Sequence, residues 1–387
     1  MTSIHPFELS YSLETIRDLK DRLRRTRLPE TETVADWTQG VPKDYISKLA
    51  AYWLEDYDFA ARAERMNRAP HFMTKIDGLD IHFVHQRSSY PNARALLITH
   101  GWPGSVLEFL DIIDPLTDPL AHGGASRDAF HVICPSLPGF GYSSKPTEPG
   151  WGPARIARTW DALMAVLGYD AYYAQGGDWG SRIARAIGEQ NLGRCRGLHL
   201  NYLNIPIPKI AANSDLPEDR RTIAELDVFQ RTGMGYAIQQ STRPQTLGYA
   251  LTDSPVGQLA WIVEKFQAWS DCDGHPENAF SIDEMLDHVT LYWMTASAAS
   301  SARLYWERAQ SNTGDQETID LPVGYSLFPK EITQTPKSWA ESYFNNLVYF
   351  NTPERGGHFA ASEQPDLFVK EVRDCFARIE DIQRSRS

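Results

Sequence analysis

A carboxylate stands at the centre of a short run of small residues near the middle of the chain. Residues 175–181 are Gln-Gly-Gly-Asp-Trp-Gly-Ser, with Asp178 as the central side chain. A strand is predicted just before this run, at 172–174, and a helix just after it, at 182–188. Small residues two positions before and after the centre are typical of a nucleophile elbow, because a Cβ there would collide with the strand or the helix.

The exchange of serine for aspartate at the centre of the elbow changes the predicted chemistry. A serine needs a base before it attacks, whereas an aspartate is ordinarily an anion at neutral pH. Attack by a carboxylate on carbon gives an alkyl ester. The electrophile is therefore expected to be a strained or activated sp³ carbon, and not a peptide or ester carbonyl. A glycine-rich connection that carries a solvated Asp178 is the alternative interpretation.

A histidine near the end of the chain is the candidate base. His358 follows two glycines in the loop after the last predicted strand, at 346–350, and Glu331 is the first carboxylate after the preceding strand, at 321–328. The order nucleophile, acid, histidine is that of the α/β-hydrolases. We therefore predict His358 as base and Glu331 as its orienting partner. Glu354 is a weaker candidate partner because it lies on the loop of the histidine itself.

A turn rich in glycine and proline supplies a candidate oxyanion hole. The buried strand predicted at 93–99 leads into residues 100–105, His-Gly-Trp-Pro-Gly-Ser. The carboxyl ends of strands are where open α/β sheets place their sites. We predict that the backbone N–H groups of Trp102 and Trp179 point at a developing oxyanion. A plain turn between a strand and a helix is the alternative.

Helical patterns replace the strands between residues 205 and 310, which predicts a cap inserted over the sheet. Tyr236 and Tyr305 lie in this stretch. Two buried phenols directed into a cleft would hold and protonate an oxygen leaving group. The chain has 17 tyrosines, so the pattern alone does not select this pair.

The remaining elements predict a mostly parallel sheet. A hairpin is expected from 71–76 and 79–85, followed by strands and helices in alternation. His82 and His85 stand three apart on a strand, face opposite sides and so do not predict a metal site. We expect four parts in chain order. Residues 1–70 form a helical N-terminal segment, 71–204 the first half of an α/β core, 205–310 the cap and 311–387 the second half of the core.

Composition excludes several classes of function. The 387 residues carry a formal net charge of −12, which makes nucleic acid an unfavourable partner. The four cysteines are widely spaced, without the pattern of a zinc site or a disulfide framework. We expect no signal peptide, no membrane-spanning segment and no membrane association, and we place the protein in the cytoplasm. The sequence does not distinguish a monomer from a homodimer.

Five motifs in one order resemble the microsomal-type epoxide hydrolases, and the resemblance spans nearly the whole chain. They are His100-Gly-Trp-Pro-Gly-Ser105, Gly176-Gly-Asp-Trp-Gly180, Ser301-x-Arg-x-Tyr-x-Glu307, Phe328-Pro-x-Glu331 and Arg355-Gly-Gly-His-Phe-Ala-Ala361. The first seventy residues resemble the N-terminal segment of that family. Since the chain has no N-terminal anchor, it resembles the soluble microbial forms, some of which serve antibiotic biosynthesis.

The resemblance implies an α/β-hydrolase fold with a mostly parallel eight-stranded sheet, a helical cap and no cofactor or metal. It implies Asp178 as nucleophile, Glu331 and His358 as charge-relay pair, and Tyr236 and Tyr305 as acids. The substrate would be a small epoxide, with water as second reactant, in detoxification or in secondary metabolism. A haloalkane dehalogenase on the same fold and a non-catalytic binding protein are the two rival hypotheses.

Overall fold

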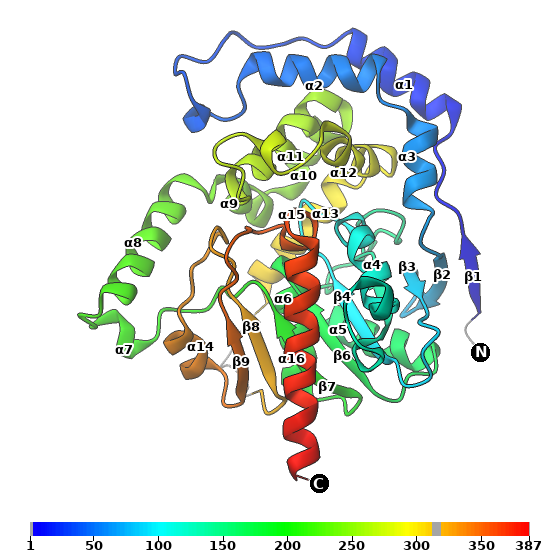
Figure 1. Cartoon of the computed structure of the whole chain (residues 1–387). Helices are drawn as coiled ribbons and strands as arrows, with labels where there is room; N and C mark the ends of the chain where they lie inside the picture. The colour runs from blue at the N-terminus through cyan, green and yellow to red at the C-terminus, as the bar shows by residue number, and fades with distance from the viewer. Residues whose placement is uncertain (1–2, 312–318, 387) are drawn as a thin grey trace.

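A nine-stranded sheet forms the centre of the computed structural model, which describes residues 3–311 and 319–386 (Figure 1). The strand order is β1-β2-β3-β5-β4-β6-β7-β8-β9. The six strands from β5 to β9 along this order run parallel, and β1, β2 and β3 are antiparallel to their neighbours. The strands are β1 (Ile4–Phe7), β2 (His71–Ile76), β3 (Leu79–Gln86), β4 (Arg94–Thr99), β5 (Phe130–Pro135), β6 (Tyr172–Gly176), β7 (Cys195–Leu200), β8 (Val323–Ser326) and β9 (Leu347–Asn351).

This sheet confirms the predicted α/β-hydrolase fold and adds one strand to it. The eight expected strands are β2 to β9. The ninth, β1, lies in the segment that was expected to be wholly helical, and it pairs with the outer edge of β2. Four residues that include Pro6 give too short a pattern to predict a strand, and proline is tolerated there because β1 is an edge.

Helices cover both faces of the sheet. Along β4, Leu96 and Ile98 belong to one apolar core, which α4 and α16 cover, while Ala95 and Leu97 belong to the other, which α5 and α6 cover. The alternation follows from the two-residue period of a strand buried on both faces. The helices beside the sheet are α4 (Leu110–Thr117), α5 (Pro153–Val166), α6 (Asp178–Gln190), α14 (Lys337–Tyr343), α15 (Ala360–Glu363) and α16 (Pro365–Arg386).

The described residues between β7 and β8 form seven α-helices, which we call the cap helices; α9 to α12 lie above the carboxyl ends of the strands, whereas α7 and α8 lie beside the sheet (Figure 1). They are α7 (Lys209–Ala212), α8 (Pro217–Thr232), α9 (Gly235–Thr242), α10 (Pro244–Asp253), α11 (Pro255–Trp269), α12 (Ile282–Met294) and α13 (Ala298–Gln310). The exact division of the chain at residues 70, 204 and 310 stays a prediction.

The N-terminal helices α1 (Leu13–Arg24), α2 (Lys43–Glu55) and α3 (Phe59–Met66) lie along the outside of the cap helices. Ser12 caps α1 by accepting the N–H of Thr15. The helical pattern from Asp44 to about Arg65 predicts one helix, but the structure has two, α2 and α3. The helix is divided because the carboxylate of Asp58 accepts the N–H groups of Ala60 and Ala61 and so begins a new helix.

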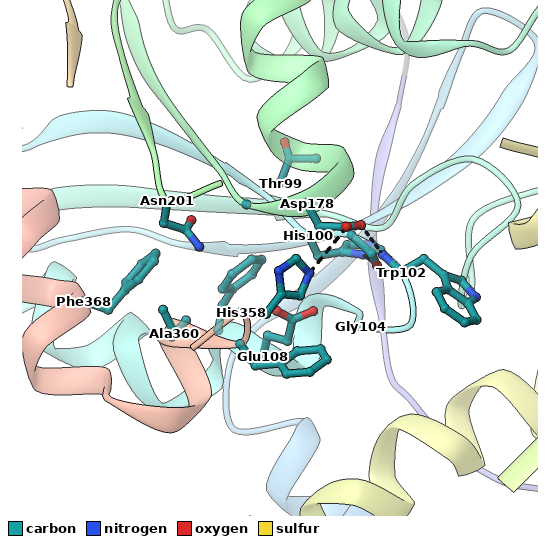
Figure 2. Close-up of a pocket in the computed structure, with 15 residues that line it drawn as sticks. Thr99, His100, Trp102, Gly104, Glu108, Asp178, Asn201, His358, Ala360 and Phe368 are labelled. Atoms are coloured by element: carbon teal, nitrogen blue, oxygen red, sulfur yellow. Dashed lines mark hydrogen bonds and ion pairs between the residues drawn. The ribbon is translucent and has the colours of Figure 1, made fainter. Parts of the chain in front are cut away.

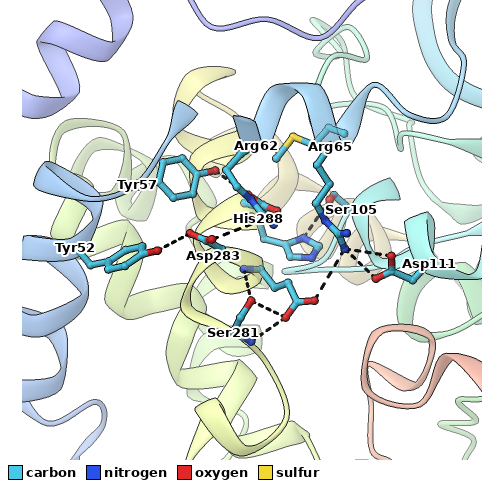
Figure 3. Close-up of polar contacts among 12 residues, drawn as sticks. Tyr52, Tyr57, Arg62, Arg65, Ser105, Asp111, Ser281, Asp283 and His288 are labelled. Carbon is cyan, nitrogen blue, oxygen red and sulfur yellow. Dashed lines mark hydrogen bonds and ion pairs between the residues drawn. The ribbon is translucent and has the colours of Figure 1, made fainter. Parts of the chain in front are cut away.

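Polar contacts join this N-terminal layer to α12 (Figure 3). The hydroxyl of Tyr57 donates to Asp287 at 2.8 Å, and the guanidinium of Arg62 forms an ion pair with the same carboxylate. The hydroxyl of Tyr52 donates to Asp283 at 3.0 Å. Because Asp287 is buried, removing Arg62 would leave its negative charge without the ion pair that compensates it.

The predicted hairpin is confirmed, with Asp77 and Gly78 at φ angles of 50° and 85° in its two-residue turn. His82 contacts His71 and Ser136, whereas His85 contacts Tyr169. Across residues 3–311 and 319–386, no three His, Cys, Asp or Glu side chains are arranged to hold a metal ion. None of the helices in these ranges combines the length and the apolar character that a bilayer crossing requires.

Candidate active site

Asp178 lies at the tip of a sharp turn between β6 and α6, as the predicted elbow requires. It is the first residue of α6, and its φ of 44° lies in the left-handed region, which side chains rarely adopt. A Cβ on Gly176 would lie 2.2 Å from backbone atoms of Gly180, and one on Gly180 would lie 1.8 Å from the carbonyl oxygen of Thr99. Both positions therefore admit only glycine, and the strained turn presents the carboxylate at the carboxyl edge of the sheet.

Two groups from distant loops meet the carboxylate of Asp178 (Figure 2). The backbone N–H of Trp102 donates to Oδ1 at 2.8 Å. The Nε2 atom of His358 lies 3.4 Å from Oδ2. A Cβ on Gly101 would lie 2.1 Å from Oδ1, so the close approach of this loop also depends on glycine. The two oxygens thus have different environments, one held by a backbone donor and the other facing the histidine.

Glu331 lies on the far side of the His358 ring. The Nδ1–H of His358 donates to Oε1 of Glu331 at 2.6 Å, and the two side chains are 3% and 0% exposed. A parallel bridge between Lys330 and Gly357 joins the loop after β8 to the histidine loop, which fixes this pair. Glu354, the weaker candidate, is exposed and has no part in the contact.

The two carboxylates determine the charge of His358. Burial by itself lowers the pKa of the ring, but the negative charge of Glu331, with Asp178 on the other side, outweighs burial and raises the pKa well above its ordinary value. The ring is therefore an imidazolium in the resting protein at neutral pH. A base role for His358 requires that one of the two negative charges first disappear.

Tyr236, from α9, and Tyr305, from α13, lie close together over this site. Their ring centroids are 5.8 Å apart. Tyr236 stacks on the indole of Trp102, and Tyr305 contacts the indole of Trp179 edge-on at 4.7 Å. Burial is the largest cause that raises the pKa of both phenols well above the ordinary value; the charge of Asp178 comes next for Tyr236, and for Tyr305 the neighbouring Tyr236 comes before Asp178. Both tyrosines are therefore neutral donors, and the buried hydroxyl of Tyr305 has no hydrogen-bond partner within the described ranges.

The structure thus brings together Asp178, Trp102, His358, Glu331 and the two tyrosines. Trp179 directly follows Asp178 at the start of α6, where backbone N–H groups have no partner within the helix. Its N–H has the position along the helix that the predicted oxyanion hole requires. The indole of Trp179 is buried under Tyr305.

Glu108 is a further carboxylate of the site, half-buried, which was not predicted from the sequence. Together with Asp178 and His358 it lines a space of about 20 Å³, which is enough for one water molecule (Figure 2). Its Oε1 accepts the N–H of Ser105 at 3.1 Å. Burial raises its pKa to about 8 despite the opposing charge of His358. The spacing Ser105-x-x-Glu108 is a capping-box signature, and this signal could have identified the residue.

Trp269, at the end of α11, was also missed. Its indole contacts Tyr236 and His358, each at 5.1 Å between ring centroids, and its carbonyl oxygen accepts the N–H of His358 at 2.8 Å. Glu363 fixes the same loop by accepting the N–H groups of Asp271, Gly357 and Phe359. No pattern in the sequence marks these contacts, because their partners come from separate parts of the chain.

Comparisons with known proteins identify the family of this chain. Residues 4–109 match the family described as epoxide hydrolase N terminus, and residues 94–272 match the alpha/beta hydrolase fold family. A Stigmatella aurantiaca protein is 52% identical over 376 residues, 97% of this chain and 85% of that protein. Epoxide hydrolase 1 of Sus scrofa is 36% identical over 98% of this chain and 89% of its own length. The crystal structure of juvenile hormone epoxide hydrolase from the silkworm Bombyx mori matches with a TM-score of 0.90 at 32% identity, over 99% of this chain and 96% of that one.

Proposed function

Because this chain belongs to the epoxide hydrolases of the α/β-hydrolase fold, we propose that it converts an epoxide to a vicinal diol through a covalent ester of Asp178. The observation that carries this proposal is the position of the Asp178 carboxylate. One oxygen is held by the N–H of Trp102, the other faces His358, and two neutral tyrosines lie above. This arrangement suits a nucleophile with acids on the opposite side of its target.

In the first step, Oδ2 of Asp178 attacks a carbon of the epoxide ring. Oδ1 stays with the N–H of Trp102 and becomes the ester carbonyl oxygen. As the carbon–oxygen bond of the ring breaks, its electron pair moves to the epoxide oxygen. That oxygen takes a proton from Tyr305 or Tyr236, whose raised pKa values keep them protonated until this point. The product of the step is a hydroxyalkyl ester.

Formation of the ester prepares the second step, because it removes the charge of Asp178. Only Glu331 then supports the charge of His358, so the pKa of the ring falls, and its proton passes to the tyrosine that protonated the epoxide oxygen and restores the neutral phenol. The neutral ring takes a proton from a water in the space beside Glu108, and the hydroxide attacks the ester carbonyl carbon. The N–H groups of Trp102 and Trp179 stabilise the oxyanion on Oδ1. Collapse breaks the bond to the ester oxygen, which takes the proton of the new carboxyl group and leaves as part of the diol, so that Asp178 is a carboxylate again.

A single turnover in oxygen-18 water tests this order of bonds. With enzyme in excess, the first diol is expected to contain no label, because its added oxygen comes from Asp178. The peptide that carries Asp178 gains the label when water attacks the ester carbonyl. Direct attack of water on the epoxide would give the opposite result, with label in the diol and none in the peptide, and would refute the ester.

We also propose that the enzyme works in the cytoplasm, since its four cysteines are buried free thiols. A role in detoxification or in the biosynthesis of an antibiotic stays a prediction. Neither assignment affects the chemistry above.

A further inference from the structure

A groove of about 1300 Å³ lies beside the active site, between α5, α6 and α13, and we call it the arginine groove. Five arginines and two glutamates line it, so it carries three positive charges in excess although the whole chain has a net charge of −12. These residues are Arg155, Arg158, Arg182, Arg185, Arg308, Glu189 and Glu307. The groove is thus positively charged in a chain that is negatively charged as a whole.

Two of the arginines already have side-chain partners within the protein. Arg155 forms an ion pair with Asp77 at 2.6 Å, and Arg158 donates to the side-chain oxygen of Gln190 at 3.0 Å. Both oxygens of Glu307 accept the N–H of Gly150 at 2.9 Å. These contacts belong to the wall of the groove.

The other three arginines differ, because none of them forms an ion pair with a carboxylate anywhere in residues 3–311 and 319–386. Arg185 is 6% exposed, its Nη1–H donates to the hydroxyl of Tyr343 at 2.8 Å, and its Nε has no hydrogen-bond partner in those ranges. Arg182 lies over the ring of Trp179 at 5.8 Å. Arg308 is half-buried, and burial followed by the charge of Arg182 lowers its pKa.

A buried guanidinium without a carboxylate is unfavourable, since removing one ion from water costs several kcal/mol unless another charge compensates it. The charge of Arg182 repels both Arg185 and Arg308, and the carboxylate of Glu189 offsets part of this repulsion. A guanidinium offers a planar pair of N–H donors that match the two oxygens of a carboxylate or a phosphate. An anion among Arg182, Arg185 and Arg308 would satisfy the free Nε and neutralise the repulsion.

The groove lies directly behind the catalytic residues. Arg182 follows Asp178 by one turn on α6, and Arg308 follows Tyr305 by three residues on α13. The guanidinium of Arg182 is 5.8 Å from the ring centroid of Trp179, which is 4.7 Å from that of Tyr305. Together these distances place Arg182 within about 10.5 Å of the Tyr305 ring. Trp179 thus separates the acids from the groove.

We propose that the arginine groove binds the carboxylate or phosphate group of a small molecule through Arg182, Arg185 and Arg308. The anionic group has two sources that share this chemistry. It is either the tail of the epoxide and its diol, which rests on the proposed function, or a separate anion that occupies the groove beside the site.

Titration with inorganic phosphate at constant ionic strength tests the site without any turnover. Wild type is expected to bind phosphate more tightly than chloride and to gain thermal stability with it. The double variant R182Q/R308Q should bind phosphate about 10-fold more weakly or worse, as expected for lost hydrogen bonds to a charged group. R185Q should show the same loss, and the double variant keeps the test valid if R185Q does not fold. R231Q, which removes an exposed arginine outside the groove, is the matched control.

Equal binding of phosphate by wild type and the double variant would overturn the proposal, and so would phosphate that binds no better than chloride. A second measurement identifies the source. If the anion is the tail of the substrate, the double variant raises KM for an epoxide with a terminal carboxylate and leaves KM for its methyl ester unchanged. If KM for the two compounds changes equally while phosphate binding is lost, the ligand is a separate anion. Failure of every epoxide to turn over would refute the proposed function and leave the phosphate result intact.

Discussion

The contact between Glu331 and His358 allows the two chemical steps to be separated. In E331Q the amide oxygen still accepts the Nδ1–H of His358, so the ring keeps its orientation while the negative charge disappears. The two atoms lie 2.6 Å apart in a pair that is almost wholly buried. The variant therefore removes charge stabilisation from the imidazolium and changes little else.

The size of the effect follows from this distance. At 2.6 Å and an effective dielectric constant of about 20, two unit charges attract by about 6 kcal/mol. The hydrogen bond that the glutamine retains offsets roughly 1 kcal/mol of this lost attraction. The variant also no longer has to bury the charge of Glu331, which offsets a further part of the loss. We expect ester hydrolysis, in which His358 gains a proton, to lose about 3 to 5 kcal/mol, or roughly 10²- to 10⁴-fold in rate. Alkylation of Asp178 should change by less than about tenfold, because His358 accepts no proton in that step.

Rapid quenching followed by intact-protein mass measurement gives both rates. Wild type should carry little ester at steady state, whereas E331Q should accumulate ester on nearly every molecule. E354Q makes the same charge change at an exposed carboxylate on the histidine loop, and it is expected to behave as wild type. An E331Q enzyme that hydrolyses its ester at the wild-type rate, or that loses both steps equally, would contradict the charge-relay role.

Three further predictions concern the other buried groups. Y236F and Y305F should each slow alkylation by roughly 10- to 1000-fold in single-turnover measurements, and the double variant should be slower than either; two unchanged single variants would place the acid elsewhere. Because the pKa of His358 is raised in the folded protein, its protonated ring stabilises the fold. This contribution to the free energy of unfolding is complete below about pH 6.5 and is lost as pH rises through the folded-state pKa. D178N removes one of the carboxylates that raise this pKa and should lose that contribution at a lower pH in thermal unfolding; an identical pH profile would refute the coupling. Because the pKa of Glu108 is raised to about 8, E108Q should resemble wild type in activity at lower pH. Its stability relative to wild type should increase as pH rises from about 4.5 towards 8. A variant that loses stability relative to wild type over this range would show that the carboxyl is ionised when folded.

The catalytic residues were predictable where the constraint is local. A Cβ on Gly176 would meet backbone atoms of Gly180 within the elbow itself, so this part of the sequence contains its own steric reason, whereas Gly180 is required by the close approach of Thr99 on the neighbouring strand β4. The order of Asp178, Glu331 and His358 follows from chain topology, since they come after the carboxyl ends of β6, β8 and β9, three strands of the parallel sheet.

Residues that act through distant contacts were not predictable in the same way. Glu108 resembles an ordinary helix cap until α6 places Asp178 beside the space that it lines. Arg182 and Arg308 lie more than a hundred residues apart and form one charged surface only because α6 and α13 border the same groove. β1 consists of four residues, and its reason to form is the free edge of β2 and not its own pattern.

The position of the oxyanion loop depends on all the layers of the molecule. The loop at 100–105 is held from above by α12, since Tyr292 donates to the carbonyl oxygen of Gly104 at 2.9 Å and His288 contacts the hydroxyl of Ser105 at 3.1 Å. Directly before His288 on the same helix, Asp287 receives Tyr57 and Arg62 from the N-terminal segment. A helix that is fixed on one side by buried ionic contacts can therefore fix a backbone loop on its other side. The N–H of Trp102 then meets Asp178 at 2.8 Å because the N-terminal segment, the cap helices and the sheet restrain the same few residues.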